Sequence, residues 1–522
     1  MRTALVKVEM NMNFRRIIKE NRKVFFVNAL SIGIAFIAFF EQILTSDIVY
    51  SMVIGELDKA PSLTEHLASG RYTNYLISWM YRFFNTFGIN KLSHQWVLQL
   101  FGILIYALAA TILYRMLASY MNVQGYSVWL NILVLICFIN PFIVETYVYV
   151  SFDWAIGVLF AVLSASMLAK GQYIKGGIIA FLAVSTYQTN IVITLLIALT
   201  GVYLQYYTEL KKLIQRVIMC GAVTAIVAVI NLVIPKICMA VGITDNIVKS
   251  TDTGDPWSLR LTWIYQNIYL SIVKAYGMLP NYFIPMVLLL GTTIVFVLQT
   301  HRYGWNKLWI PVLWIVFVVW MMLLPYVPCF VATYPGFPQR TMLSMFIALA
   351  MVMIVSLFFI RQGLSVLKNG YKVLILVVAG ALVLATESSI KDCYVCNAMD
   401  KYEARCIQEA ISEYEDESGM EITTIAVHRP GFIHYTYPEQ TSVYVYTLFA
   451  HRMFYDSWSD VNLLNYLYGK HYKRIDMDEL YTDTYDSYQK FITSHWEGKY
   501  WDRLNIDEQI IFDGNTMYWS LY

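Results

Sequence analysis

Ionisable side chains of this chain collect at the ends of apolar runs, where they could meet the polar part of a substrate at a membrane surface. Asp47 follows the first apolar run directly, and Glu145 and Asp153 flank a short connection between two later runs. Arg340 stands where another run begins. A carboxylate can accept a proton from a hydroxyl, and an arginine can hold a phosphate. This placement favours a site for a substrate with a lipid tail and a polar head.

Further polar groups belong to the same boundary. Arg71 opens an amphipathic segment, and Tyr187 with Gln188 interrupts a long apolar stretch within the sequence STYQTN. A polar break at membrane depth must line a cavity or be paired inside the protein. Aromatic side chains in a later loop could stack on sugar rings or form an interfacial belt: Trp257, Tyr265 and Tyr269.

Each candidate also has a plain structural explanation. Asp47 could simply end a helix, and Glu56 and Asp58 are alternative carboxylates in the same loop. The two arginines could anchor the chain to lipid phosphate without specificity. The two later carboxylates could serve only to hold an arginine in place.

The composition is that of an integral membrane protein. Of the 522 residues, 58% are hydrophobic and only 14% are charged, whereas a soluble domain carries about 25% charged residues. The net charge of +2 provides no basic field for nucleic acid. Most of the cysteines are scattered, and the single C-x-x-C pair, Cys393 and Cys396, has no second pair at zinc spacing. A local disulfide there is an open alternative.

The apolar runs that set this boundary predict a mainly α, polytopic protein with about 11 transmembrane helices. The segment 175–207 is too long for one span, and its polar centre indicates two shorter helices that meet near Tyr187. The other spans are expected at about 24–44, 95–118, 127–144, 154–169, 213–234, 281–300, 308–325, 340–360 and 371–387.

Basic residues give the expected orientation. The N-terminal segment before the first span carries five Arg and Lys residues between 15 and 23 and is expected in the cytoplasm. Five basic loops then fall on the same side, provided that 175–207 crosses twice. They contain Arg115; Lys170 and Lys175; Lys211, Lys212 and Arg216; His301, Arg302 and Lys307; Arg361, Lys368 and Lys372.

The opposite, outer side is expected to carry the long loops and a second domain. We expect a transmembrane domain at 1–387, with outer loops at 45–94 and 235–280, and a small extracytoplasmic α/β domain at 388–522. Within that second domain, 398–417 predicts a helix and EITTIAVHR a strand. The sequence EQIIFDGNTMYWSLY predicts a hairpin that turns at Asp513–Gly514–Asn515.

In the first outer loop, residues 63–87 predict a helix that lies in the membrane interface. Its apolar residues recur at helical spacing, and Arg71, Asn74, Ser78, Arg82 and Asn85 recur on the other side. We expect the apolar face to contact lipid and the polar face to turn toward water or a site.

Several motifs resemble, in order, those of the polytopic bacterial glucosyltransferases that modify O-antigen, the type II glucosyltransferase family. They are SDIVY, ASGRYTNYL, NPFIVETYVYVSFDWAIGVLFAVLSA and AVSTYQTNI. The resemblance covers about residues 30–345. The family often has paired acidic residues after the first span, whereas Ser46 precedes Asp47 here.

The resemblance implies an inverting GT-C membrane glycosyltransferase with its catalytic domain at 1–387. It would transfer a hexose, with glucose expected first, from a polyprenyl-phosphate donor to a cell-envelope glycan at the outer face of the bacterial cytoplasmic membrane. Asp47 would be the catalytic base, and Arg71 and Arg340 would bind the donor phosphate. The residues that would bind the sugar or line the site are Glu145, Asp153, Tyr187 and Gln188. We expect no cofactor and no metal site, although a divalent metal stays open, and no nucleic-acid partner.

Two other functions remain as alternatives at this level. A flippase or exporter of lipid-linked glycans would need polar residues along a path through both leaflets, and the cytoplasmic halves of the spans look too apolar for that. A glycan polymerase would use a lipid-diphosphate donor instead of a monophosphate.

Overall fold

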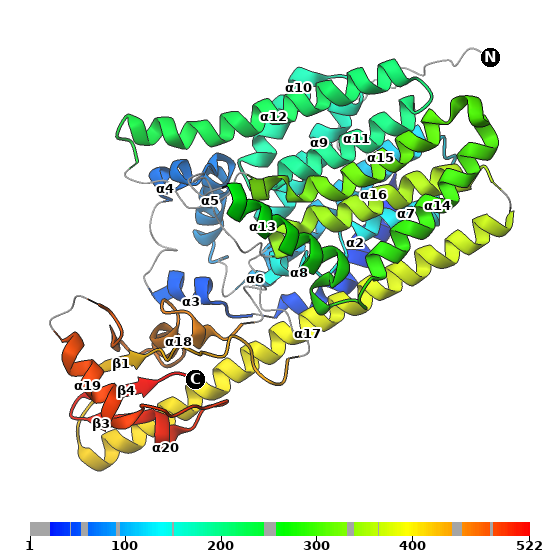
Figure 1. Ribbon diagram of the computed structural model, residues 1–522. Coiled ribbons are helices and arrows are strands. Elements are labelled where there is room, and N and C mark those ends of the chain that lie inside the picture. The colour runs from blue at the N-terminus through cyan, green and yellow to red at the C-terminus, as the bar shows by residue number, and fades with distance from the viewer. Residues whose placement is uncertain are drawn as a thin grey trace. The chain divides into compact units, whose positions relative to one another are not determined.

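The described part of the chain is mostly helical, with one small sheet near its C-terminal end (Figure 1). The computed structural model describes residues 21–41, 43–53, 61–89, 94–148, 151–244, 257–330, 339–363, 365–440, 451–480 and 484–522. It divides into two compact units. The first comprises Met1–Glu41 with Pro61–Glu387, and the second comprises Gln42–Ala60 with Ser388–Tyr522.

The first unit is a bundle of mostly apolar helices. They are α2 (Arg22–Ala35), α4 (Leu63–Ala68), α5 (Tyr72–Asn85), α6 (Gln95–Tyr120), α7 (Val128–Ile136), α8 (Val144–Val148), α9 (Ser151–Ala169), α10 (Tyr173–Val184), α11 (Asn190–Tyr206), α12 (Leu210–Ala240), α13 (Trp257–Ile268), α14 (Phe283–Tyr303), α15 (Trp309–Leu323), α16 (Leu343–Ile360) and the first part of α17 (Ser365–Ser418). Short irregular turns of helix include η1 (Ile37–Phe40), η4 (Tyr269–Val273), η5 (Ala275–Gly277), η6 (Trp305–Lys307), η7 (Leu324–Phe330) and η8 (Gln339–Met342).

Seven helices in the described part of the chain are long and apolar enough to cross a membrane: α6, α9, α12, α14, α15 continued into η7, α16 and α17. Two predicted spans are interrupted. The span expected at 24–44 is divided between α2 and η1, and that at 127–144 stops at Ile136. Asn140 stabilises the second interruption, because its Oδ1 accepts the backbone N–H groups of Phe142 and Ile143. The prediction of about eleven spans therefore stays an expectation.

Two other boundaries differ from the prediction. The outer loop expected from residue 235 begins later, because α12 continues through Pro235 to Ala240. The helix of the last expected span, 371–387, does not end there, because α17 runs without interruption from Ser365 to Ser418; the division between the two units falls within this helix, between Glu387 and Ser388. Near residue 387 the composition of α17 changes from apolar to charged. This change alters what the helix contacts, but the helix continues.

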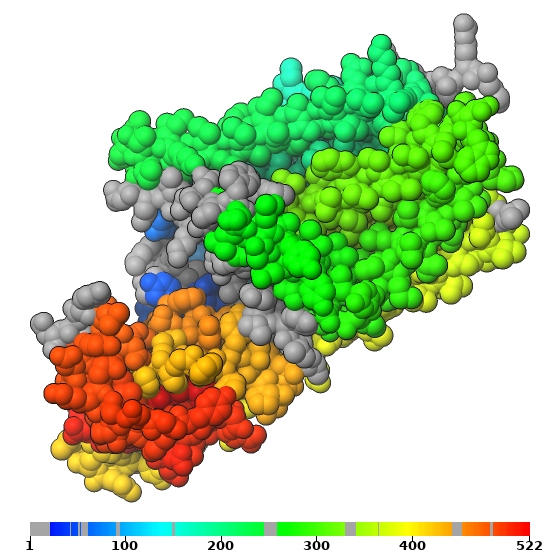
Figure 2. Space-filling view, viewed as in Figure 1, coloured from blue at the N-terminus to red at the C-terminus, as the bar shows by residue number. Residues whose placement is uncertain are grey.

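The interior of the first unit lies around α9 and α16. Nearly every residue of α16 is buried, and α9 packs against α6, α10 and α11. Peripheral helices such as α12 and α14 expose apolar side chains, including Ile226, Val229 and Leu289. Figure 2 shows both helices at the surface of the first unit. This pattern suits a bundle that is surrounded by lipid, since apolar side chains then remain out of water.

The predicted interruption of 175–207 is confirmed. The helices α10 and α11 are separated by residues 185–189, called here the α10–α11 break. Asn190 donates to the carbonyl of Ala183 at 3.1 Å and to Thr186 Oγ1 at 2.9 Å. Gly157 of α9 lies against this break so closely that an added Cβ would stand 2.3 Å from Thr186 Oγ1.

The loops that carry most of the basic residues lie together at one end of the bundle, called here the basic end. Lys23 at the start of α2 lies over the ring of Tyr126, and Lys372 of α17 lies over Trp129. Arg216 donates to the hydroxyl of Tyr173 at 3.0 Å. This grouping agrees with the expectation that the basic loops share one side of the membrane.

The second unit is an α/β structure with apolar clusters on both faces of its sheet. Its sheet has the order β2-β1-β4-β3, built from β1 (Thr424–His428), β2 (Lys473–Asp476), β3 (Ile510–Asp513) and β4 (Thr516–Ser520). Strand β1 is parallel to β2 and β4, and β3 forms an antiparallel hairpin with β4. The predicted strand and hairpin are therefore confirmed. The other helices are α3 (Ser46–Val53), α18 (Asp460–Tyr468), α19 (Tyr485–His495) and α20 (Ile506–Gln509).

One core of this unit joins the end of α17 to a segment far away in the sequence. Ile407 and Ile411 of α17 pack in the same cluster as Leu44 and Val49. The amide of Asn397 donates to the carbonyl of Leu44 at 3.1 Å. The segment that carries Asp47 therefore packs within the second unit, whereas the sequence assigned it to the membrane domain.

Candidate active site

A tight corner joins α4 to α5 and is fixed to the α10–α11 break. Gly70 turns the chain with a φ of 68°, a conformation in which a Cβ is strained. The backbone carbonyls of the corner are bound by side chains, because Gln188 Nε2 donates to Ser69 at 2.6 Å and Asn231 Nδ2 donates to Gly70 at 2.8 Å. The predicted single helix at 63–87 is therefore two helices, with the corner held from outside.

The corner brings Arg71 against the break. Its guanidinium lies over the ring of Tyr187, 5.3 Å from the ring centre, and the ring of Trp154 packs on the same tyrosine at 4.2 Å. The Nε atom of Arg71 is buried and has no hydrogen-bond partner among the described residues. Arg71, Tyr187 and Gln188, predicted from separate motifs, thus meet at one place.

One face of α5 carries a row of polar atoms, and the other is apolar. Asn74 Oδ1 and Arg82 Nη1 are buried, and in the described structure neither has a hydrogen-bond partner. On the opposite side Leu76 and Phe83 are 60% and 61% exposed. The predicted amphipathic character is confirmed. Arg82 is a second cation on the polar side of this helix, with its guanidinium over the ring of Trp79, and the spacing of the polar residues in the sequence was the signal for it.

Asp153 lies beside the same helix. It is in the first turn of α9 and interacts with the hydroxyl of Tyr81, a residue of α5. Tyr106 of α6 is a further neighbour, and its hydroxyl lies 3.2 Å from Thr146 Oγ1. Asp153 therefore interacts with Tyr81 beside the α5 polar face, with Tyr106 near by.

Glu145 lies deeper and in a different element. It is 2% exposed and belongs to the short helix α8, which follows the turn stabilised by Asn140. The turn η8, which carries Arg340, lies against α8. The backbone thus brings these two predicted residues into neighbouring elements, and the side chain of Arg340 lies outside the described part of the structure.

Asp47 is in the second unit. It is exposed in the first turn of α3, where Thr45 Oγ1 accepts the N–H of Ile48 at 3.2 Å. Leu44 and Val49 anchor this short helix in the core on either side of the carboxylate. Asp47 is therefore an accessible carboxylate on a fixed segment. The alternative carboxylates Glu56 and Asp58 lie outside the described residues.

The later outer loop gives a mixed result. Tyr265 and Tyr269 are exposed by 72% and 41%, which suits an interfacial belt, and the side chain of Trp257 lies outside the described part of the structure.

Two buried polar residues of the first unit were not predicted from the sequence. Arg260 of α13 is 3% exposed, and Asn231 of α12 is 1% exposed. An amide within an apolar helix was the available signal for Asn231.

In the part of the chain that the structure describes, no group of three His, Cys, Asp or Glu side chains could hold a metal ion. The polar groups available at α5 are guanidinium, amide and phenol groups. They suit the recognition of phosphate and sugar hydroxyls.

Comparison with known protein families gives one match. The model of the family described as Glucosyl transferase GtrII matches residues 56–360, which is more than half of the chain. The match contains Arg71, the α10–α11 break and η8, and it begins after Asp47. No curated protein and no solved structure matches the chain. The chain therefore belongs to the GtrII glucosyl transferase family, and it is a membrane glucosyltransferase.

Proposed function

We propose that the chain transfers glucose from a polyprenyl-phosphate donor to a cell-envelope glycan at the outer face of the bacterial cytoplasmic membrane. The observation that carries this proposal is the two-sided character of α5. Its apolar face is exposed at Leu76 and Phe83, while Arg71 and Arg82 have buried N–H groups without partners in the described structure. A donor with a polyprenyl chain and a phosphate needs these two surfaces on one element.

The two arginines would hold the donor phosphate. A guanidinium presents N–H groups in a fixed fork, so it can bind two phosphate oxygens and neutralise the charge of the leaving group. Stacking on Tyr187 would fix the orientation of Arg71 and leave its N–H edge for the ligand. Arg340 would supply a third cation, supported by the position of η8 against α8.

The remaining site residues would position the sugar. Asp153 stands at the edge of the polar face, where a carboxylate can accept hydrogen bonds from sugar hydroxyls. Tyr187 and Gln188 would line the site from the α10–α11 break. Glu145 is buried next to η8, and we assign it the role of orienting Arg340.

The reaction is a displacement at the anomeric carbon. The acceptor hydroxyl oxygen forms the new bond to this carbon, and its proton passes to the base, for which we propose Asp47. The bond from the anomeric carbon to the phosphate oxygen breaks, and its electron pair leaves with polyprenyl phosphate. One displacement inverts the anomeric centre. The carboxylate of Asp47 is exposed and can reach an acceptor from water.

We also propose an orientation for the chain. The basic end of the bundle would face the cytoplasm, because Lys and Arg are enriched in cytoplasmic loops. The residues 388–522 would then form an extracytoplasmic domain.

The test is the transfer of label from polyprenyl-phosphate glucose in membranes that contain Asp47→Asn. Loss of a general base typically costs a factor of about 10² to 10⁴ in rate. The matched control is Glu65→Gln, since Glu65 is also an exposed carboxylate in the first turn of a short helix. Undiminished transfer by folded Asp47→Asn protein would remove Asp47 as the base, and loss in Glu56→Gln or Asp58→Asn would reassign that role.

A further inference from the structure

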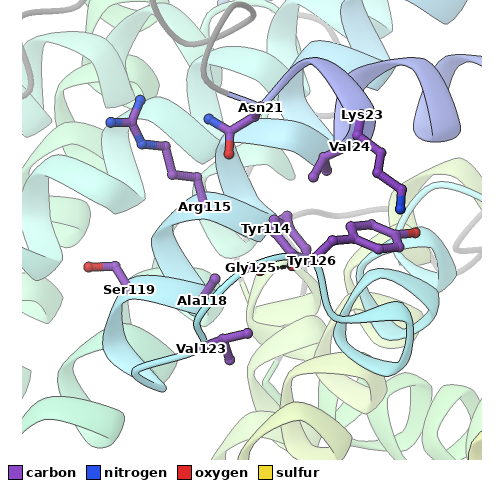
Figure 3. A pocket seen from close by; sticks show the side chains of 10 residues that line it. All are labelled: Asn21, Lys23, Val24, Tyr114, Arg115, Ala118, Ser119, Val123, Gly125 and Tyr126. Atoms are coloured by element: carbon purple, nitrogen blue, oxygen red, sulfur yellow. Dashed lines mark hydrogen bonds between the residues drawn. The ribbon is translucent and has the colours of Figure 1, made fainter.

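A cavity lies at the basic end, away from the proposed active site. It has a volume of about 420 Å³, is open on one side, and is lined by the start of α2, the end of α6 and the loop that leads to α7 (Figure 3). Asn21, Lys23, Tyr114, Arg115 and Tyr126 supply most of its polar groups. Its volume falls within the range of sites that bind small molecules, about 300–1,000 Å³.

The cavity is cationic. Lys23 and Arg115 come from α2 and α6 and stand on different sides of it (Figure 3), and the described residues that line it include no Asp or Glu. Lys170 is close enough to Arg115 for their charges to interact, and burial together with that charge lowers the pKa of Lys170 from its ordinary value.

The polar groups are held in place by local contacts. The ammonium of Lys23 lies 4.8 Å from the centre of the Tyr126 ring. The hydroxyl of Tyr114 accepts the N–H of Ser127 at 2.8 Å and donates to the carbonyl of Gly125 at 3.3 Å. These two hydrogen bonds fix the loop before α7 to α6. The wall of the cavity therefore has a defined position.

An apolar stripe leads away from the cavity along α2 and onto the first residue of η1. Phe26, Leu30, Ile34 and Ile37 follow Lys23 at helical spacing, and each is at least 60% exposed. In a bilayer this stripe would face acyl chains. A ligand with a phosphate at Lys23 and a hydrocarbon chain along the stripe would use both surfaces, whereas a soluble anion would use only the cavity.

We propose that this cavity binds the phosphate headgroup of an anionic phospholipid, with the acyl chains along the apolar stripe of α2. Basic pockets between transmembrane helices on the cytoplasmic side are known to bind anionic headgroups, and the charge of each nearby Lys or Arg adds to the affinity. This site is independent of glucosyl transfer, because Lys23 and Arg115 have no part in the proposed reaction.

The test measures lipid binding by the purified, full-length chain. Native mass spectrometry would compare phosphatidylglycerol with phosphatidylcholine, which has a zwitterionic headgroup, for the wild type and for Lys23→Gln/Arg115→Gln. The matched control is Lys372→Gln/Arg302→Gln, because it removes two charges that also lie over aromatic rings near the basic end and that do not line the cavity. Melting temperatures would check that all variants are folded.

We expect selective binding of phosphatidylglycerol by the wild type and the control. Each lost charge should weaken binding roughly fivefold, and the cavity double variant should lose at least tenfold. Lys23→Gln alone alters an exposed side chain and should show the single-charge effect even if the double variant does not fold. Equal binding in the single variant, the control and the wild type would overturn the proposal. Displacement of the lipid by millimolar inorganic phosphate would also overturn it, in favour of a soluble anion.

Discussion

Replacing Gly70 by alanine perturbs the α4–α5 corner at a point where the chain has little space. The new Cβ would lie 3.2 Å from Asn231 Oδ1 and 3.5 Å from Gln188 Nε2. The positive φ costs about 1–2 kcal/mol for a residue with a Cβ. The contacts also weaken the two side-chain hydrogen bonds to the corner, and each weakened bond adds about 0.5 kcal/mol, the lower end of the net worth of a hydrogen bond. We therefore expect the corner to lose about 2–3 kcal/mol of local stability.

Gly88→Ala is the matched control. Gly88 has a φ of 74° and no atom within 4 Å of the added Cβ, so this variant has the backbone strain without the steric contact. Hydrogen exchange of peptides around each site would report the local free energy of opening. Exchange at the Gly70→Ala corner should accelerate roughly 30- to 150-fold, against about five- to 30-fold at Gly88→Ala.

The same pair tests the link between the corner and activity. A shift of Arg71 by about 1 Å can cost up to 10²-fold in rate, so Gly70→Ala should lower transfer from polyprenyl-phosphate glucose at least tenfold. Gly88→Ala should keep transfer within about twofold of the wild type, since no site contact changes. Equal effects of the two variants on both exchange and transfer would refute the idea that the corner positions Arg71.

Other variants test neighbouring features. Gly157→Ala should destabilise the α10–α11 break by about 1–3 kcal/mol through overpacking, measured by hydrogen exchange, whereas Gly221→Ala on α12 meets no atom within 4 Å and should be neutral. Arg82→Gln should raise KM for the polyprenyl-phosphate donor about tenfold in steady-state kinetics, and an unchanged KM would exclude Arg82 from donor binding. Arg452→Met should cost the second unit about 3–5 kcal/mol, because it leaves the buried carboxylate of Glu403 without its cation. Arg405→Met, which breaks an exposed pair, should change the exchange of β1 amides little.

Features set by local pattern could be predicted from the sequence. The STYQTN break was visible because polar residues interrupt an apolar run, and the two faces of α5 were visible because their residues recur at helical spacing. The hairpin at Gly514 followed from its turn residues. For the same reason Arg71, Tyr187 and Gln188 could be selected before their contacts were known.

Features set by distant contacts could not be predicted. The pairing of Leu44 with Asn397 joins residues 353 positions apart, and no local pattern indicates it. Asn140 ends a run that is apolar enough to span, because its side chain binds backbone groups of the following turn. The continuity of α17 was hidden by composition, since charged residues are as compatible with a helix as apolar ones.

The central proposal is that a lipid-linked sugar is the donor. The most direct measurement supplies membranes containing this chain with glucose labelled either in polyprenyl-phosphate glucose or in a nucleotide diphosphate glucose. We predict that label enters the cell-envelope glycan from the lipid donor without nucleotide, and that Arg71→Gln reduces this transfer. Label that enters only from the nucleotide sugar, with the lipid donor inert, would contradict the proposal.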